Sequence, residues 1–296
     1  MRLAGRADEV GRMSLFETIA ADAPQLSRSF RRIAAYVERE REGFMHKTVR
    51  ELALAAEVSE PTLIRFCRHY GCSGVPEFRI ALAMSLAERN AADRTRLFEP
   101  VIEDKNVVNR DAKRAIARHA AQLAKDDGRI ILDSGSTMQM MAEELRDAEA
   151  LTILTTGLNN VQVLRASRQH TIIVPGGTFR PESMSLVGRM VESSLSTMHF
   201  DTAYLGSDSI DPVIGLSTFH EDEAHQNLAM IAASARLVVL ADASKFSTPA
   251  LHRICGIDKV HTIITDARLP QEARSRIAGM GVELICVDPS LEGTDR

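Results

Sequence analysis

The spacing of apolar residues changes along the chain and divides it into two parts. In the first third, apolar residues recur at intervals of three and four, as on one face of a helix. The clearest case predicts a helix from Ser27, which can cap its first turn, to about Arg41. The residues expected on its core face are Phe30, Ile33, Ala34 and Val37.

A pair of short helices is predicted between Thr48 and Gly71. Thr48 and Glu51 have the spacing of a capping box, which predicts that a helix begins there. A tight turn at 57–58 separates it from a second helix, which Ser59 caps and Gly71 ends. Two helices of this length joined by a short turn are typical of DNA-binding helix-turn-helix units.

The second of these helices has an apolar face and a polar face. Its outward arginines suit a helix that reads the major groove, because arginine pairs with guanine edges. The same pattern fits a helix that only packs in a bundle, so the spacing alone leaves both interpretations open. The expected buried residues are Leu63, Phe66, Cys67 and Tyr70. The residues expected to contact DNA are Thr48, Ser59, Glu60, Thr62, Arg65, Arg68 and His69.

After about residue 109, short apolar runs alternate with stretches of helical spacing. Alternation of this kind implies parallel strands joined by right-handed crossovers. We therefore expect an α/β fold with a mostly parallel sheet covered by helices on both faces, preceded by a small all-α domain. Strands are predicted at 129–133, 151–155, 171–174, 201–205, 237–241, 260–264 and 282–287.

Small and polar residues follow these strands, at the sheet edge where α/β folds bind ligands. The loop from Asp133 to Thr137, DSGST, opens a helix whose first N–H groups suit an anion such as phosphate. Hydroxyls, glycines, carboxylates and one lysine together fit a phosphorylated polyol, although each alone also fits a cap, a turn or a surface charge. The expected ligand-binding residues are Asp133, Gly135, Ser136, Thr137, Thr155, Thr156, Gly176, Gly177, Asp208 and Lys245.

Composition and charge narrow the class of protein. Hydrophobic residues at 45% and charged residues at 26% are ordinary globular values. With no apolar run of about 18 residues and no export signal, we expect a cytoplasmic location. Residues 1–98 carry 16 Lys and Arg against 13 Asp and Glu, whereas the rest carry 20 against 27. The mildly basic first part suits a polyanionic partner.

Metal chemistry is not indicated by the sequence. The four cysteines form no C-x-x-C pair, so we expect reduced, structural thiols. His220 and His225 lie five residues apart, which misses the i, i+4 spacing of a helical metal pair. We therefore expect neither a metal nor a cofactor.

The helix pair resembles the N-terminal helix-turn-helix of the MurR/RpiR family of bacterial transcriptional regulators. The family pattern is V-S-x-x-T-x-x-R-F-C-R-x-x-G-x-x-G, and the resemblance covers about residues 15–88. The matching positions are Val58, Ser59, Thr62, Arg65, Phe66, Cys67, Arg68, Gly71 and Gly74. The sugar-isomerase domain that usually follows in that family has no counterpart here.

The second part instead resembles the sensor domain of DeoR-type regulators, over about residues 109–288. The runs that carry this resemblance are DSGST, VPGGTFRPESMSLVG at 174–188, HFDTAYLGSDSI at 199–210 and ADASKF at 241–246. The resemblance implies a fold similar to ribose-5-phosphate isomerase and a phosphorylated sugar as effector. By motif, Gly135 to Thr137 become phosphate-loop residues, Gly177 and Asp208 pocket residues, and Lys245 a phosphate or hydroxyl contact. Glu223 joins the expected site as the acidic start of a helix.

The chain departs from that family at several positions. Thr155, Thr156 and Gly157 stand where the family usually has Thr-Asn-Ser, and Ser209 stands where Gly is common. Asn227 and Thr202 each replace a frequent Lys. These differences bear on which effector binds rather than on its class.

We therefore expect a flexible N-terminus at 1–13, a DNA-binding domain at 14–88, a linker at 89–108, a sensor domain at 109–290 and a flexible C-terminus at 291–296. The favoured function is a transcriptional regulator of sugar or polyol genes, expected to act as a repressor. The alternatives are a sugar-phosphate isomerase, with Asp208, Glu223 and Lys245 as acid and base, and a protein-binding scaffold. The expected partners are operator DNA, a phosphorylated sugar or polyol, and a second copy in a homodimer or homotetramer.

Overall fold

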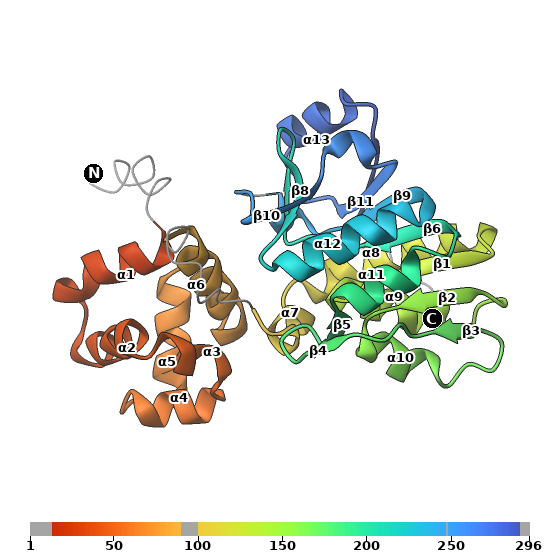
Figure 1. The fold of residues 1–296 in the computed structure, drawn as a ribbon. Coiled ribbons are helices and arrows are strands. Elements are labelled where there is room, and N and C mark those ends of the chain that lie inside the picture. The colour runs from red at the N-terminus through yellow and green to blue at the C-terminus, as the bar shows by residue number, and fades with distance from the viewer. Residues whose placement is uncertain (1–13, 90–99, 247, 291–296) are drawn as a thin grey trace. The chain divides into compact units, whose positions relative to one another are not determined.

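The computed structural model of the protein describes residues 14–89, 100–246 and 248–290. The chain forms two compact units, residues 1–108 and residues 109–296 (Figure 1). The expectations of flexible ends at 1–13 and 291–296 lie outside the described residues, as does much of the expected linker.

The N-terminal unit is helical. Phe66 packs α5 against the core of this unit. Its ring lies edge-on to Phe30 and to Phe78, with ring centroids 5.4 and 5.6 Å apart, respectively. The buried faces of α2 and α5 are those expected from the spacing, with Phe30 and Tyr70 only partly covered. The helices are α1 (Leu15–Asp22), η2 (Ala23–Gln25), α2 (Arg28–Arg39), α3 (Arg41–His46), α4 (Val49–Ala55), α5 (Glu60–His69), α6 (Val75–Arg89) and α7 (Ile102–Val107).

Helix α7 lies within the segment expected to be a linker. It packs on α6 through a buried ion pair, in which Arg79 Nη1 lies 3.1 Å from Asp104 Oδ1. Arg79 also donates to the carbonyl oxygens of Phe44 and Lys47, so its guanidinium joins three segments of the unit. Burial raises the pKa of Asp104, although Arg79 opposes that rise.

The C-terminal unit contains a seven-stranded parallel sheet in the order β12-β11-β9-β6-β1-β2-β3, which confirms the expected fold class. All seven predicted strands are present, with ends shifted by up to three residues. They are β1 (Arg129–Leu132), β2 (Thr152–Thr155), β3 (Thr171–Ile173), β6 (Phe200–Leu205), β9 (Ser234–Leu240), β11 (Thr262–Asp266) and β12 (Glu283–Val287).

Alternate residues of each strand feed two cores, one on each face of the sheet. In β1, Ile130 and Leu132 pack with α8 and α9, whereas Ile131 packs with α11 and α12. The helices of this unit are α8 (Arg110–Leu123), η4 (Ala124–Asp126), α9 (Ser136–Leu145), α10 (Leu158–Leu164), α11 (Arg189–Leu195), α12 (Glu221–Ala232), η5 (Ala243–Lys245), η6 (Ile257–Lys259) and α13 (Gln271–Ala278).

Two small antiparallel sheets were not expected from the sequence. One is the hairpin β4 (Thr178–Arg180) with β5 (Ser185–Val187). The other joins β7 (Ser209–Asp211), β8 (Gly215–Thr218) and β10 (His252–Cys255). Each strand has only three or four residues, which is too short for a clear two-residue period. Gly215, at a φ of +96°, lets β8 approach Cys255 so closely that a Cβ would strike its carbonyl.

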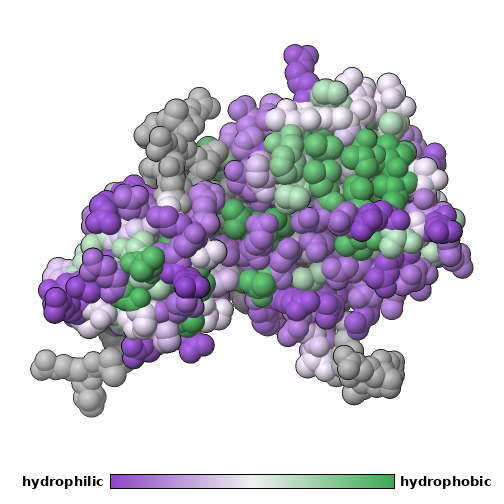
Figure 2. Space-filling view, turned by 90° about the horizontal axis from the view of Figure 1, so that it is seen from below, coloured by the Kyte–Doolittle hydropathy of each residue, from purple (hydrophilic) through white to green (hydrophobic). Residues whose placement is uncertain are grey.

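The surface view in Figure 2 shows apolar area gathered on part of the C-terminal unit. Exposed large apolar residues of the C-terminal unit include Val174 after β3, Phe179 in β4 and Met190 in α11. Among the described residues, no helix is both long and apolar enough to cross a membrane.

Candidate functional site

Two local structures place α5. Thr48 Oγ1 accepts from the Glu51 amide at 3.3 Å, and the Glu51 carboxylate accepts from the Thr48 amide at 2.8 Å, which fixes the start of α4. The hydrogen bond from the Thr48 amide is the main cause that lowers the pKa of Glu51. Glu57, at a φ of 52°, makes the turn, and α5 begins after Ser59.

The polar face of α5 is exposed, as the spacing predicts. Arg65 and Arg68 point into solvent, where Arg65 Nη2 donates to Thr62 Oγ1 at 3.2 Å and Arg68 Nε donates to the Ser73 carbonyl at 3.4 Å. The Ser59 and Thr62 hydroxyls lie 2.9 Å apart. Ser59, Glu60, Thr62, Arg65, Arg68 and His69 thus share one helix and its cap, while Thr48 lies at the start of α4. The His69 ring also packs 5.6 Å from Phe30.

Cys67 lies on the opposite, buried face of α5. Burial raises the pKa of its thiol to about 12, so it stays protonated and packs as a small apolar residue. All four cysteines are free thiols.

In the C-terminal unit, the DSGST loop connects β1 to α9. Gly135 adopts a φ of +108°, which other residues rarely reach, and α9 starts immediately after it. The Ser136 and Thr137 side chains are buried in the first turn of α9. Asp133 is also buried, and its Oδ2 accepts from the Gly206 amide at 3.3 Å, which ties the ends of β1 and β6 together.

Thr155, the last residue of β2, and Thr156, which follows it, are fully buried, and each meets an amide side chain. Asn160 Nδ2 donates to Thr155 Oγ1 at 2.9 Å and to the Asp133 carbonyl at 2.7 Å. Gln226 Nε2 donates to Thr156 Oγ1 at 3.1 Å. Within the described structure, Asn160 Oδ1 and Gln226 Oε1 are buried without a hydrogen-bond partner. Both amides were missed, because neither follows a strand.

A charged network joins the other expected residues. Arg180 Nη1 lies 2.6 Å from Glu223 Oε1, and both side chains are largely buried. Thr218 Oγ1 lies 3.1 Å from Glu223 Oε2 and 3.0 Å from Asp208 Oδ2. Lys245 Nζ lies 3.9 Å from Asp208 Oδ1. Because a hydroxyl has one proton, Thr218 can donate to only one of the two carboxylates at a time. The structure thus brings Asp208, Glu223 and Lys245 together and adds Arg180 and Thr218.

The hairpin that carries Arg180 is bound to the end of β2. The Leu186 amide donates to the Thr156 carbonyl at 3.0 Å, and the Leu158 amide donates to the Met184 carbonyl at 2.8 Å. Within the hairpin, Gly177 lets the start of β4 lie close to β5, since a Cβ there would lie 2.9 Å from the Val187 carbonyl oxygen. Gly176 and Gly177 lie just before β4, so their geometry explains how the hairpin packs.

Lys245 is placed by a second polar cluster. Asp242 Oδ1 accepts from the Ser244 amide at 3.0 Å and from Asn109 Nδ2 at 2.9 Å. Asp266 Oδ2 accepts from the Ala243 amide at 2.8 Å, and Asp266 Oδ1 lies 2.6 Å from Arg268 Nε. Burial alone would raise the pKa of Asp266, but hydrogen bonds from Arg268 and Ala243 outweigh it and lower the pKa. These contacts hold the start of η5, which carries Lys245.

The family departures fall in different places. Thr202 lies near the start of β6, where it donates to Asp127 Oδ1 at 2.9 Å and accepts from Arg236, away from the strand ends. Thr202 thus lies near the opposite end of β6 from Gly206 and Asp208, which follow that strand. Asn227 and Ser209 are buried, on α12 and β7, and Asn227 Oδ1 has no partner within the described residues. No group of three or more His, Cys, Asp or Glu in the described ranges is placed to hold a metal ion.

Two protein families match the chain. Residues 13–89 match the helix-turn-helix domain of the rpiR family, and residues 108–267 match the DeoR C terminal sensor domain. These are the two families that the sequence motifs resemble.

Named relatives are transcriptional regulators. A protein of Escherichia coli O157:H7, named for repression of the aga operon, is 36% identical over 64% of this chain and 70% of its own length. The transcriptional repressor GlcR of Bacillus subtilis is 30% identical over 72% of this chain and 84% of its own.

A solved structure of ribose 5-phosphate isomerase A from Neisseria gonorrhoeae aligns with a TM-score of 0.34 at 15% identity, covering 46% of this chain and 53% of that one. The chain belongs to the family of DNA-binding transcriptional regulators that carry the DeoR C-terminal sensor domain, and its helix-turn-helix is of the rpiR family.

Proposed function

We propose that the protein represses sugar or polyol genes by binding operator DNA through α5, and that a phosphorylated sugar or polyol in the C-terminal unit changes this binding. The family matches and the relatives' names favour a regulator over the isomerase alternative. We further propose that the protein acts as a dimer or tetramer, because one recognition helix covers too few base pairs for useful specificity.

The observation that carries the effector proposal is the network around Arg180 and Lys245. It holds two cations and two carboxylates at the ends of β6 and β9 and beside α12. A phosphate group is attracted to the cations and to the N–H groups at the start of α9, but repelled by the carboxylates. Asp208 and Glu223 instead suit the hydroxyls of a polyol, which donate hydrogen bonds to carboxylates. An effector with one phosphate and several hydroxyls satisfies both sets.

Thermal unfolding with phosphosugars and the matching free sugars tests the effector class. A phosphosugar at about a hundred times its Kd adds about 2.7 kcal/mol to the free energy of unfolding, which raises Tm, while the free sugar at the same concentration adds none. Thr137→Val and Lys245→Ala should abolish the shift, and Lys259→Ala, which removes an exposed lysine, should keep it. Equal shifts from free sugars would rule out a phosphate sensor.

A further inference from the structure

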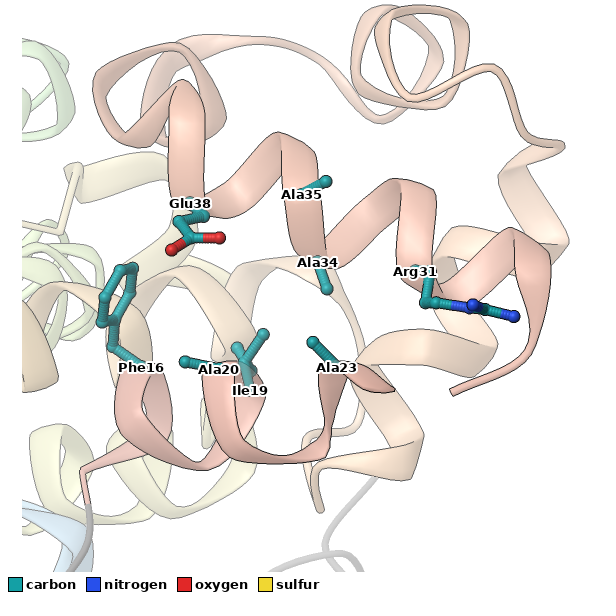
Figure 3. A pocket seen from close by; sticks show the side chains of 8 residues that line it. All are labelled: Phe16, Ile19, Ala20, Ala23, Arg31, Ala34, Ala35 and Glu38. Carbon is teal, nitrogen blue, oxygen red and sulfur yellow. The ribbon is translucent and has the colours of Figure 1, made fainter. Parts of the chain in front are cut away.

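An apolar pocket of about 250 Å³ lies between α1 and α2 of the N-terminal unit (Figure 3). Phe16 and Ile19 of α1 form one wall, and Ala34 and Ala35 of α2 form part of the other. Its only charged lining residues are Arg31 and Glu38, which lie toward opposite ends of α2 in the view. The lining is therefore mainly apolar, with Arg31 toward one end and Glu38 toward the other.

The two charges are related by a simple symmetry. Arg31 and Glu38 are seven residues apart, which places them on one face of α2, separated by about 10 Å along the axis. Ala34 and Ala35 lie midway between them. A second α2, running antiparallel about a two-fold axis through this midpoint, brings Arg31 opposite Glu38 of the partner subunit, and the reverse. Ala34 is buried in its own core, but the small side chain of Ala35 is exposed beside the axis and lets the two helices come close.

The charges on this face differ from two other charges on α2, those of Arg32 and Arg39. Arg32 pairs with Glu57 at 3.4 Å, and Arg39 pairs with Glu40 at 3.5 Å, within the same chain. Neither the Arg31 nor the Glu38 side chain forms an ion pair with any described residue. In the antiparallel arrangement, a second copy of α2 places the opposite charge beside each of these two side chains.

We propose that two copies of the chain pair through α1 and α2, antiparallel, with Arg31 of each against Glu38 of the partner subunit. Such a contact is isologous, so it closes at two copies and presents two α5 helices with two-fold symmetry. The inference rests on the proposed dimer and adds the surface that forms it.

Disulfide cross-linking of the full chain tests the surface directly. Ala35→Cys places an exposed thiol beside the axis, and Leu54→Cys places one at an exposed position on α4 as the control. Under a mild oxidant, we expect the Ala35→Cys variant to form a covalent dimer at least about tenfold faster than the Leu54→Cys variant. Equal rates, in a chain that sedimentation shows to be dimeric, would overturn this surface while leaving the proposed dimer standing.

Charge reversal in the Ala35→Cys background tests the pairing itself. Arg31→Glu and Glu38→Arg should each slow cross-linking about fivefold, because each places like charges together twice. The double variant restores opposite charges and should cross-link within about twofold of the parent. A double variant as slow as either single variant would overturn the pairing. Labelling with maleimide gives a second contradicting outcome. If the Ala35→Cys thiol reacts with maleimide only after deletion of residues 1–13, and no dimer forms, the chain's own N-terminus occupies the pocket and the pairing is overturned.

Discussion

In the N-terminal unit, the residues proposed to contact DNA lie mostly on the exposed surface of one helix. In the C-terminal unit, the residues proposed to bind the effector come from distant segments of the chain and are largely buried. Arg65 and Arg68 are exposed to solvent, and they donate hydrogen bonds to Thr62 and Ser73 of the same motif. Arg180 is instead held by Glu223, which is 43 residues away in sequence. Function and stability are therefore expected to separate in the first unit and to be coupled in the second.

The largest expected effect is on stability in the C-terminal unit. Arg180→Ala leaves Glu223 mostly buried without its arginine, which should cost about 3 kcal/mol in the free energy of unfolding. Urea denaturation measures this. Arg146→Ala, which breaks an exposed pair with Asp147, should leave the free energy of unfolding close to the parent value, because solvent screens an exposed pair. Equal costs for the two variants would contradict the expected coupling of stability to this buried network.

The next effect is on DNA affinity in the N-terminal unit. If Arg65 reaches a base edge, Arg65→Ala should cost about 2 kcal/mol of operator binding and relax sequence preference, with Tm unchanged. Arg39→Ala serves as the control, since Arg39 is also exposed but lies on α2. Gel-shift titration on the protein's own promoter decides the matter, and unchanged affinity and specificity for Arg65→Ala would contradict the assignment of α5.

A smaller effect is expected where the β4–β5 hairpin approaches α11. Gly177→Ala forces a Cβ to within 3.0 Å of Val191 and closer still to the Val187 carbonyl oxygen, so it should cost about 1 to 2 kcal/mol in urea denaturation. Gly74→Ala, whose added Cβ only touches Pro76 at 3.8 Å, should be close to neutral. A neutral Gly177→Ala would show that the hairpin moves freely.

The smallest effect concerns acid stability. The folded state lowers the pKa of Asp266 below its unfolded value of about 3.9, so the resulting stabilisation is complete above that pH and is lost as the pH falls through the folded pKa. Asp266→Asn should therefore flatten the fall in stability below about pH 4. An acid limb with the same slope in variant and parent would count against this network.

The sequence predicts much of the fold because its strongest signals are local. Ile130, Ile131 and Leu132 form one buried run, whose alternate residues then feed the two cores. Capping residues such as Thr48 and Gly135 set helix starts through neighbouring atoms only. The exposed face of α5 follows from its own spacing, because one core on one side decides which residues point outward.

The parts that escaped prediction depend on contacts between distant residues. Arg180 sits in a three-residue strand whose place is set by hydrogen bonds to the end of β2. Asn160 and Gln226 lie on helices, and only the folded sheet brings them to Thr155 and Thr156. Thr202 is the opposite case. The family comparison suggested that this position bears on the effector, but the structure shows Thr202 near the start of β6, where it donates to Asp127.

The central claim is that an effector held in the C-terminal unit alters DNA binding by the N-terminal unit. Operator affinity of the full chain, measured with a panel of phosphosugars and matching free sugars, tests it most directly. We expect one or more phosphosugars to change affinity by at least about fivefold in the parent, and no change in Lys245→Ala, whose affinity without effector stays at the parent value. A normal response in Lys245→Ala, or free sugars as effective as their phosphates, would contradict the account.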